Sequence, residues 1–193
     1  MRRCAGLLLL FLVASCSASR PEVPSGQEGR ALYTCCTLAF DLGRYASDAN
    51  YDYRTYREAV VLPVGTRVRV TEDHGSMIKF EPEGMVDSFR LAFKFGTARM
   101  TAAEWFRLIL VEDDPRLVVS RMPADAAAAI TEGRLAIGMT KPQAIMARGY
   151  PPFHRTAGIE VDDWLYYASP GFVDRVIFTE GRIASVNREE APK

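Results

Sequence analysis

The sequence predicts an α+β fold, in which a small antiparallel β module precedes two helices and a three-stranded antiparallel meander. Three observations favour this fold. Apolar and polar residues alternate in short runs between residues 31 and 95, and this period of two is typical of half-buried strands. Capping boxes at Thr101 and Thr140 then begin helical segments. Three further alternating runs follow the second capping box and predict a meander. We therefore divide the chain into a β-rich module ending in a helix, 31–115, and a helix-helix-meander module, 116–190.

The predicted strands of the first module are separated by glycine-containing turns. Pro63-Val64-Gly65 and Asp73-His74-Gly75 suit such turns, and the last run places four large apolar side chains on one face. The segment Leu62–Phe80 also resembles a bacterial SH3-type repeat, although it lacks a tryptophan. Strands this close in sequence indicate a small antiparallel sheet or barrel. The expected strands are Ala31–Leu42, Thr66–Val70, Met77–Glu81 and Phe89–Phe95.

The predicted helices begin at capping residues and end at glycine or proline. In each capping box the threonine hydroxyl and the side chain three residues later satisfy free amide groups of the first turn. Glu180-Gly181 suits the tight turn between the last two strands. The expected helices run from Thr101 to before Asp113, from Ala124 to Glu132 and from Thr140 to Gly149. The expected strands of the meander are Asp163–Ala168, Phe172–Thr179 and Arg182–Asn187.

The start of the chain has the layout of an export signal. Two arginines precede an apolar run, roughly Ala5 to Ala14, that is shorter than the about 18 apolar residues a membrane span requires. The run ends in Val13-Ala14-Ser15-Cys16, which resembles the lipobox of bacterial lipoproteins. The resemblance implies that the signal peptide, 1–15, is removed by cleavage between Ser15 and Cys16. It also implies that the Cys16 sulfur carries a diacylglycerol thioether; the alternative is an ordinary secretory signal cut after Ala18.

Residues 16–30 are predicted to be a lipidated flexible tether. They are rich in Ser, Pro, Gly and charged residues, and Val23 is their only branched apolar side chain. Such a segment cannot bury enough apolar surface to order itself. At about 3.3 Å per residue it would hold the folded part up to roughly 50 Å from a lipid surface.

Two cysteines, Cys35 and Cys36, remain once Cys4 leaves with the signal and Cys16 is acylated. Neighbouring Cα atoms lie about 3.8 Å apart, below the usual disulfide range of about 4.4 to 6.8 Å. A strained vicinal redox pair is one interpretation. We expect instead that strand alternation directs one thiol into a core and the other outward.

The C-terminal segment resembles the SmpA/OmlA, or BamE-like, family of small outer-membrane lipoproteins over roughly residues 125–188. The resemblance implies two helices on three strands, an arrangement also similar to that of proteins that inhibit β-lactamases. It further implies an accessory, non-catalytic role at the periplasmic face of the outer membrane in the assembly of β-barrel proteins. The β-rich residues that precede the segment depart from the family's plan. The residues that carry the resemblance are Gly138-Met139-Thr140, Gln143, Gly149-Tyr150-Pro151-Pro152, Asp163-Trp164, Tyr166, Val176, Phe178, Gly181 and Val186.

Candidate binding residues are clearer than candidate catalytic ones. Tyr51, Tyr53 and Tyr56 lie in a hydrophilic stretch, and tyrosines there suit a surface that binds peptide, lipid headgroup or glycan. The alternative is an edge strand or an ordered loop packed on the sheet. His154, an aspartate at 162 or 163, and Ser169 lack a nucleophile elbow, so we expect no catalytic residues. We also expect no metal site and no cofactor, because no metal-ligand spacing is present.

These patterns predict a non-catalytic lipoprotein of the outer membrane that acts through protein contacts. Its expected partners are the membrane, through the N-terminal lipid, and outer-membrane assembly proteins. Without residues 1–15 the chain loses two arginines and carries 22 basic against 24 acidic side chains. That balance gives no electrostatic footprint for nucleic acid. The alternative function is an envelope protein that binds cell-wall glycan or lipid through its N-terminal β module.

Overall fold

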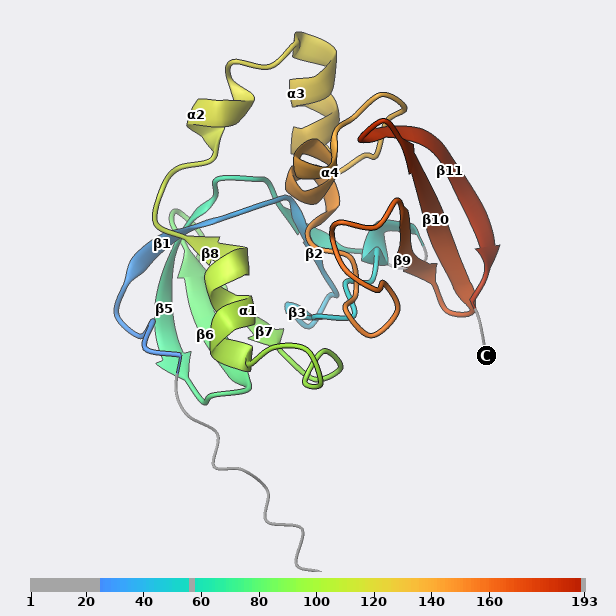
Figure 1. The fold of residues 1–193 in the computed structure, drawn as a ribbon. Coiled ribbons are helices and arrows are strands. Elements are labelled where there is room, and N and C mark those ends of the chain that lie inside the picture. Colours follow the sequence, from blue (N-terminus) through green and yellow to red (C-terminus); the bar gives the residue numbers. More distant parts are fainter. Residues whose placement is uncertain (1–24, 56–57, 192–193) are drawn as a thin grey trace, which may run out of the picture.

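The computed structural model describes residues 25–55 and 58–191, which form a mixed α+β fold (Figure 1). The described part contains four α-helices and sheets of six, three and two strands. The strands are β1 (Ala31–Thr34), β2 (Leu38–Phe40), β3 (Tyr45–Ser47), β4 (Val60–Leu62), β5 (Arg67–Asp73), β6 (Met77–Pro82), β7 (Phe89–Ala92), β8 (Leu110–Val111), β9 (Asp163–Ser169), β10 (Phe172–Thr179) and β11 (Arg182–Glu190). The helices are α1 (Ala102–Ile109), α2 (Arg116–Val119), α3 (Ala124–Thr131), α4 (Lys141–Arg148) and a 3₁₀ turn, η1 (Tyr53–Thr55).

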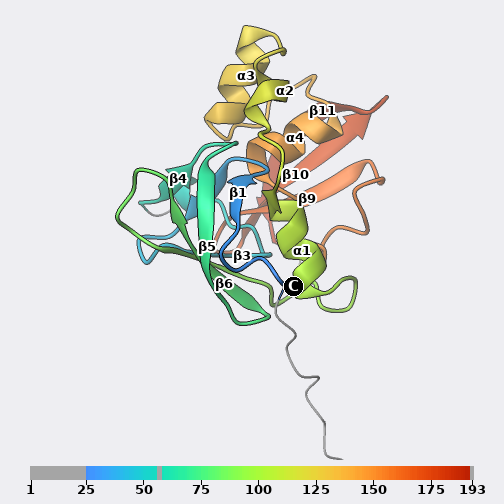
Figure 2. The same cartoon turned by 90° about the vertical axis from the view of Figure 1, so that its left-hand side faces the viewer.

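The six-stranded sheet has the order β3-β7-β6-β5-β1-β8 and curls into a half-barrel (Figure 2). Strands β5 and β6 bury alternate side chains, as the sequence pattern predicts. Helix α1 begins at the capping box of Thr101 and Glu104, so that prediction is confirmed. Its buried side chains, Trp105, Phe106 and Ile109, belong to the same hydrophobic core as the inward-facing residues of the sheet.

The predicted single strand Ala31–Leu42 is wrong, because the chain breaks into β1 and β2 around Cys35 and Thr37. The Cys35 amide donates to the carbonyl of Ile109 at 2.8 Å, and the Thr37 amide donates to the carbonyl of Met146 at 2.9 Å. These bonds interrupt the strand after Thr34 and change the direction of the chain. Strand β1 therefore pairs with β5 and β8, whereas β2 pairs with β4 in a separate sheet.

The first module is also not wholly antiparallel, and its fourth predicted strand is shorter than expected. Strand β3 pairs with β7 in parallel. Strand β7 ends at Ala92, because the Asp48 carboxylate accepts the amides of Lys94, Phe95 and Gly96 and draws the chain into a loop. Phe95 consequently lies 48% exposed instead of joining the buried face of the sheet.

The C-terminal part contains α3 and α4 followed by the three-stranded meander β9-β10-β11. Ile130 of α3 and Ala144 of α4 pack with Trp164 and Phe178 of the sheet in a second hydrophobic core. The capping box of Thr140 is confirmed. The turn between β10 and β11 has positive φ at both central residues, Glu180 and Gly181, as tight hairpin turns require.

The two predicted modules share a junction instead of standing apart. Val64 packs in the second core, and Phe153 packs in the first. The segment before η1 lies against β9, where the Asp52 amide donates to the Tyr167 carbonyl at 3.0 Å. The two hydrophobic cores are therefore linked by hydrogen bonds, and each contains a side chain from the other predicted module.

Residues 25–30, the end of the predicted tether, are docked on the first module. The Ser25 hydroxyl and the Gly26 amide donate to the Asp73 carboxylate at 2.6 and 3.0 Å, and the Gly29 amide donates to Val70. Gln27 is 2% exposed. Residues 25–30 are therefore held against β5 by the Ser25 side chain and the Gly26 and Gly29 amides, and Arg30 pairs with Glu112.

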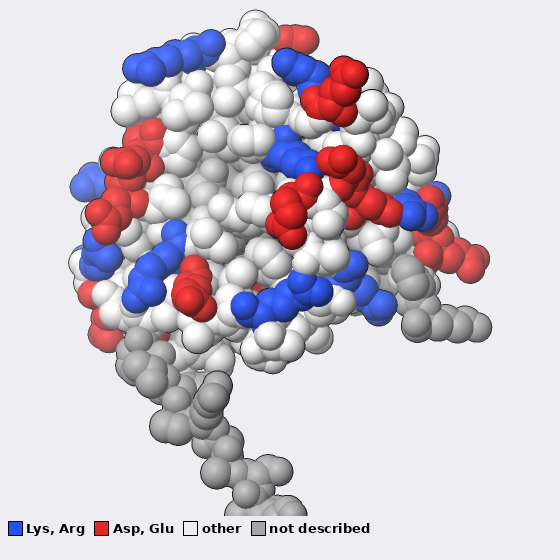
Figure 3. Space-filling model, in the orientation of Figure 1, with Lys and Arg blue, Asp and Glu red and all other residues white. Residues whose placement is uncertain are grey.

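Charges of both signs alternate over the face shown in Figure 3. Many are paired across strands, as in Arg69 with Glu81 and Arg175 with Asp163. Within residues 25–55 and 58–191, no helix combines the length and the apolar character required to cross a membrane.

Candidate functional site

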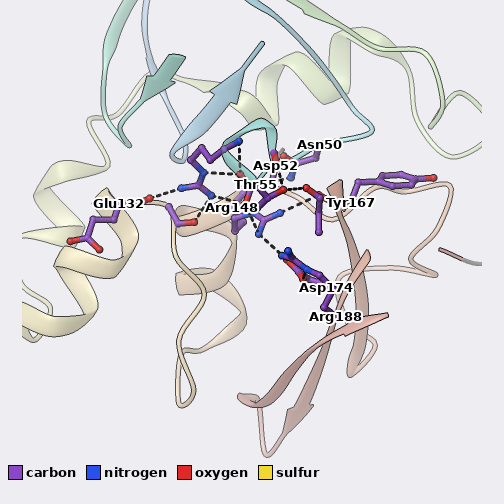
Figure 4. A network of polar contacts seen from close by, with 11 residues as sticks. Asn50, Asp52, Thr55, Glu132, Arg148, Tyr167, Asp174 and Arg188 are labelled. Atoms are coloured by element: carbon purple, nitrogen blue, oxygen red, sulfur yellow. Dashed lines mark hydrogen bonds and ion pairs between the residues drawn. The ribbon is translucent and has the colours of Figure 1, made fainter. Parts of the chain in front are cut away.

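A chain of alternating arginines and aspartates lies at the junction of the two cores (Figure 4). Four elements or their flanks supply it: the segment at η1, the last residue of α4, and strands β10 and β11. We call this set the junction cluster. Its members, in order of contact, are Arg54, Asp52, Arg148, Asp174 and Arg188.

Arg148 is the central cation of the junction cluster. Its Nη1 atom lies 3.2 Å from Asp52 Oδ2 and 3.5 Å from Asp174 Oδ2, and all three side chains are less than one-tenth exposed. Its Nη2 atom donates to the Tyr167 carbonyl at 3.4 Å, and the guanidinium lies 5.2 Å from the centre of the Tyr166 ring. A buried guanidinium requires such partners, because unpaired burial of a charge is costly.

The two outer arginines extend the junction cluster towards solvent. Arg54 donates from Nε to Asp52 at 2.7 Å and from Nη2 to the Gly133 carbonyl at 2.7 Å, so it also joins η1 to the end of α3. Arg188 donates to both oxygens of Asp174 at 2.9 and 3.1 Å, which is the two-pronged geometry of strong arginine-carboxylate pairs. Each aspartate is therefore shared between two arginines.

The contacts of Asp52 and Arg188 favour the charged forms of these two side chains. Burial alone would raise the pKa of Asp52, but the Arg148 charge and the hydrogen bonds from Arg54 together hold that pKa below its ordinary value. The hydrogen bonds to Asp174 raise the pKa of Arg188 above its ordinary value. Asp52 and Arg188 are therefore both charged near neutral pH.

Local hydrogen bonds fix the end of α4 that carries Arg148. The Asn50 Nδ2 atom donates to the carbonyls of Arg148 and Tyr150 at 2.6 and 2.8 Å, and Asn50 itself adopts a positive φ of 52°. The Tyr166 hydroxyl donates to the Gly149 carbonyl at 2.9 Å. These bonds satisfy carbonyls that the end of a helix leaves free.

An open pocket of about 660 Å³ lies beside the junction cluster. Its volume falls in the range of small-ligand sites, which is about 300 to 1,000 Å³. The five members of the junction cluster line it, together with Gly133, Arg134, Leu135 and Val186. Four arginines and two aspartates therefore line the pocket.

The predicted tyrosine site is described only in part. Tyr51 is half-buried and stacks on Tyr167 with ring centres 4.5 Å apart, whereas Tyr53 is 9% exposed. Burial, and after it the neighbouring Tyr167, raise the pKa of Tyr51 above its ordinary value. Tyr56 lies outside the described residues. The described pair packs as an ordered loop on the C-terminal sheet, and its role in binding stays a prediction.

Tyr51 belongs to a row of aromatic rings in contact that reaches solvent. His154 lies 5.8 Å from Tyr167 and 5.1 Å from Phe95, measured between ring centres. His154 and Phe95 are exposed. The row therefore ends in two exposed rings, His154 and Phe95.

The other sequence predictions are placed as follows. Ser15 and Cys16 lie outside the described residues. A disulfide joins Cys35 to Cys36. The vicinal pair, and not the expected strand alternation, is what the structure has, because these residues occupy the break between β1 and β2.

The histidine and aspartates considered for hydrolase chemistry contact other groups. His154 contacts the Tyr167 hydroxyl, and Asp163 pairs with Arg175. Within the described part of the chain, no hydrogen bond joins His154 to Asp162, Asp163 or Ser169, and no group of three or more His, Cys, Asp or Glu residues is arranged to hold a metal ion.

The comparisons with known proteins add no relative. No family model, curated protein or solved structure matches this chain.

One feature of the sequence indicates the junction cluster. Asp174 has the same strand phase as Val176 and Phe178, and Arg188 has the phase of Val186, so both charges fall on the apolar face of the meander. Charged residues on a buried face require partners. The partners come from distant segments, which a pattern along the chain does not reveal.

Proposed function

We propose that this protein is a lipid-anchored, non-catalytic component of the bacterial envelope, held at the periplasmic face of the outer membrane and acting through contacts with other proteins. The observation that carries the proposal is the sequence Val13-Ala14-Ser15-Cys16 at the end of a short apolar run behind two arginines. A thioether-linked diacylglycerol and a further acyl chain would bind a membrane firmly, since each buried CH₂ contributes about 0.8 kcal/mol.

The test of the anchor is replacement of Cys16 by serine in the full-length chain. The Cys16→Ser variant is expected to lose labelling by a fatty acid and to leave the membrane fraction. Cys4→Ser is the matched control, because Cys4 precedes the cleavage point and its loss should change neither result. Unchanged labelling and partitioning of Cys16→Ser would remove the anchor from the proposal.

The finer proposal is that the protein assists the assembly of β-barrel proteins in the outer membrane. It rests on the resemblance of residues 125–188 to the BamE-like family, and the order of α3, α4 and the meander agrees with that resemblance. Affinity purification of the tagged protein from detergent-solubilised membranes should recover barrel-assembly components. Recovery of none of them would contradict this role and leave the anchor untouched.

One observation favours the alternative function, binding of cell-wall glycan or lipid. The row of Tyr51, Tyr167, His154 and Phe95 places aromatic rings in contact, and His154 and Phe95 at its end are exposed. Binding to isolated sacculi that is lost in Tyr51→Ala and Phe95→Ala, but kept in the control Tyr33→Ala on β1, would support it. No binding of the unaltered protein would exclude it.

A further inference from the structure

We infer that the pocket beside the junction cluster binds a carboxylate carried by an acidic segment of a partner protein. The inference gives a chemistry to the protein contacts proposed above, and it rests on that proposed function. Figure 4 shows Arg148 of α4 and Asp52, next to η1, converging with Asp174 and Arg188 of the meander.

The first argument is the charge of the pocket wall. The junction cluster contains three arginines and two aspartates, so it carries one unbalanced positive charge. Arg134, the fourth arginine of the wall, pairs with Glu132 and adds no further excess. A pocket wall with an excess of positive charge favours an anionic ligand over a neutral or cationic one.

The second argument is the supply of hydrogen-bond donors. Arg134 uses Nε for Glu132, and among the described residues neither of its Nη atoms has a hydrogen-bond partner. Arg188 uses Nε and Nη2 for Asp174, which leaves Nη1 without a partner in the same part of the chain. The side chains of Arg134 and Arg188 are 58% and 48% exposed, so these donors are accessible. Arginine forks match the planar geometry of a carboxylate.

The third argument is the size and the apolar part of the pocket. Leu135 and Val186 line it next to the arginines, and both are partly buried. Their methyl groups suit the methylene carbons of a glutamate side chain. The volume of about 660 Å³ exceeds the needs of one carboxylate, so neighbouring residues of the same segment can occupy the remainder. An extended acidic peptide fits these features together.

The experiment measures binding of a fluorescent, end-capped tetraglutamate peptide to the purified full-length protein, with tetraglutamine as the uncharged comparison. Tetraglutamate should bind at low salt and weaken as salt is added, because exposed charges are screened. Arg134→Gln and Arg188→Gln should each weaken binding by about tenfold, the value of a charge-assisted pair of about 1.4 kcal/mol. The matched control is Arg175→Gln, since Arg175 is 44% exposed and pairs with Asp163 on the same sheet, outside the pocket.

Three results would overturn the inference. They are the absence of tetraglutamate binding, equal binding of tetraglutamine, and an equal loss in Arg175→Gln. Tighter displacement of the peptide by inorganic phosphate than by acetate would overturn the assignment to a carboxylate. Thermal unfolding of each variant establishes that it is folded. Because Cys16→Ser protein can be used in the same measurement, failure of the lipid anchor and failure of the pocket are separate outcomes.

Discussion

Replacement of Arg148 by methionine should destabilise the protein by about 3 kcal/mol. Arg148 lies 3.2 Å from Asp52 and 3.5 Å from Asp174, and the side chains of the two aspartates are 6% and 8% exposed. At an effective dielectric constant near 20, each attraction is about 5 kcal/mol before desolvation is subtracted. Removing one partner of a buried ion pair typically costs about 3 to 5 kcal/mol. The lower value applies because Arg54 and Arg188 still contact the aspartates.

The assay is urea unfolding followed by circular dichroism near neutral pH. With a slope of about 2 kcal/mol per molar urea, the midpoint of Arg148→Met should fall by about 1.5 M. The matched control is Arg175→Met, because Arg175 and Asp163 are each 44% exposed. An exposed pair contributes about 0 to 1 kcal/mol. The destabilisation by Arg148→Met should shrink in acid, where Asp52 becomes protonated.

Two outcomes would refute this account of the junction cluster. One is a loss of stability in Arg148→Met no greater than in Arg175→Met. The other is a loss that stays constant as pH falls below about 4, since the cost is attributed to unpaired carboxylates. Either result would mean that the arginine contributes packing alone.

Three further predictions concern single polar contacts. The folded pKa of Asp52 lies below the ordinary value of 3.8, so its stabilising contribution is complete above that pH and is lost as pH falls through the folded pKa. The melting temperature measured against pH should therefore drop in acid, and Asp52→Asn should flatten that drop. Asp73→Asn should speed hydrogen exchange of the Gly26 amide, because Asp73 accepts from it, whereas Glu72→Gln should leave that exchange unchanged. Thr140→Ala should lower the free energy of unfolding by about 1 kcal/mol through loss of the helix cap, as measured by urea unfolding.

The elements that the sequence predicted well are those whose causes are local. The caps at Thr101 and Thr140 act within one helical turn, and the structure has both. The meander follows from alternation and from the turn at Glu180-Gly181, whose residues adopt positive φ. Neighbouring residues alone decide such features, so a pattern along the chain is sufficient to find them.

The features that the sequence did not predict depend on distant partners. The break after Thr34 arises because Cys35 and Thr37 bond to the ends of α1 and α4. The junction cluster likewise joins Asp52 to Arg148 and Asp174, which come from three separate elements. Burial of Asp174 was visible as a charged residue in an apolar phase, but no local signal identified the arginine that neutralises it.

The contact of Ser25 with Asp73 sets the exit point of the chain from the fold. Residues 17–24 are the only ones between Cys16 and the docked segment, and such a length reaches at most roughly 30 Å when extended. With an acylated Cys16, this short connection would hold the end of β5 and the start of α1 towards the lipid. Helices α2 and α3 lie at the opposite pole in Figures 1 and 2, so they would point into the aqueous space. A flexible insert before Ser25 would lengthen the connection and relax this orientation without changing the fold.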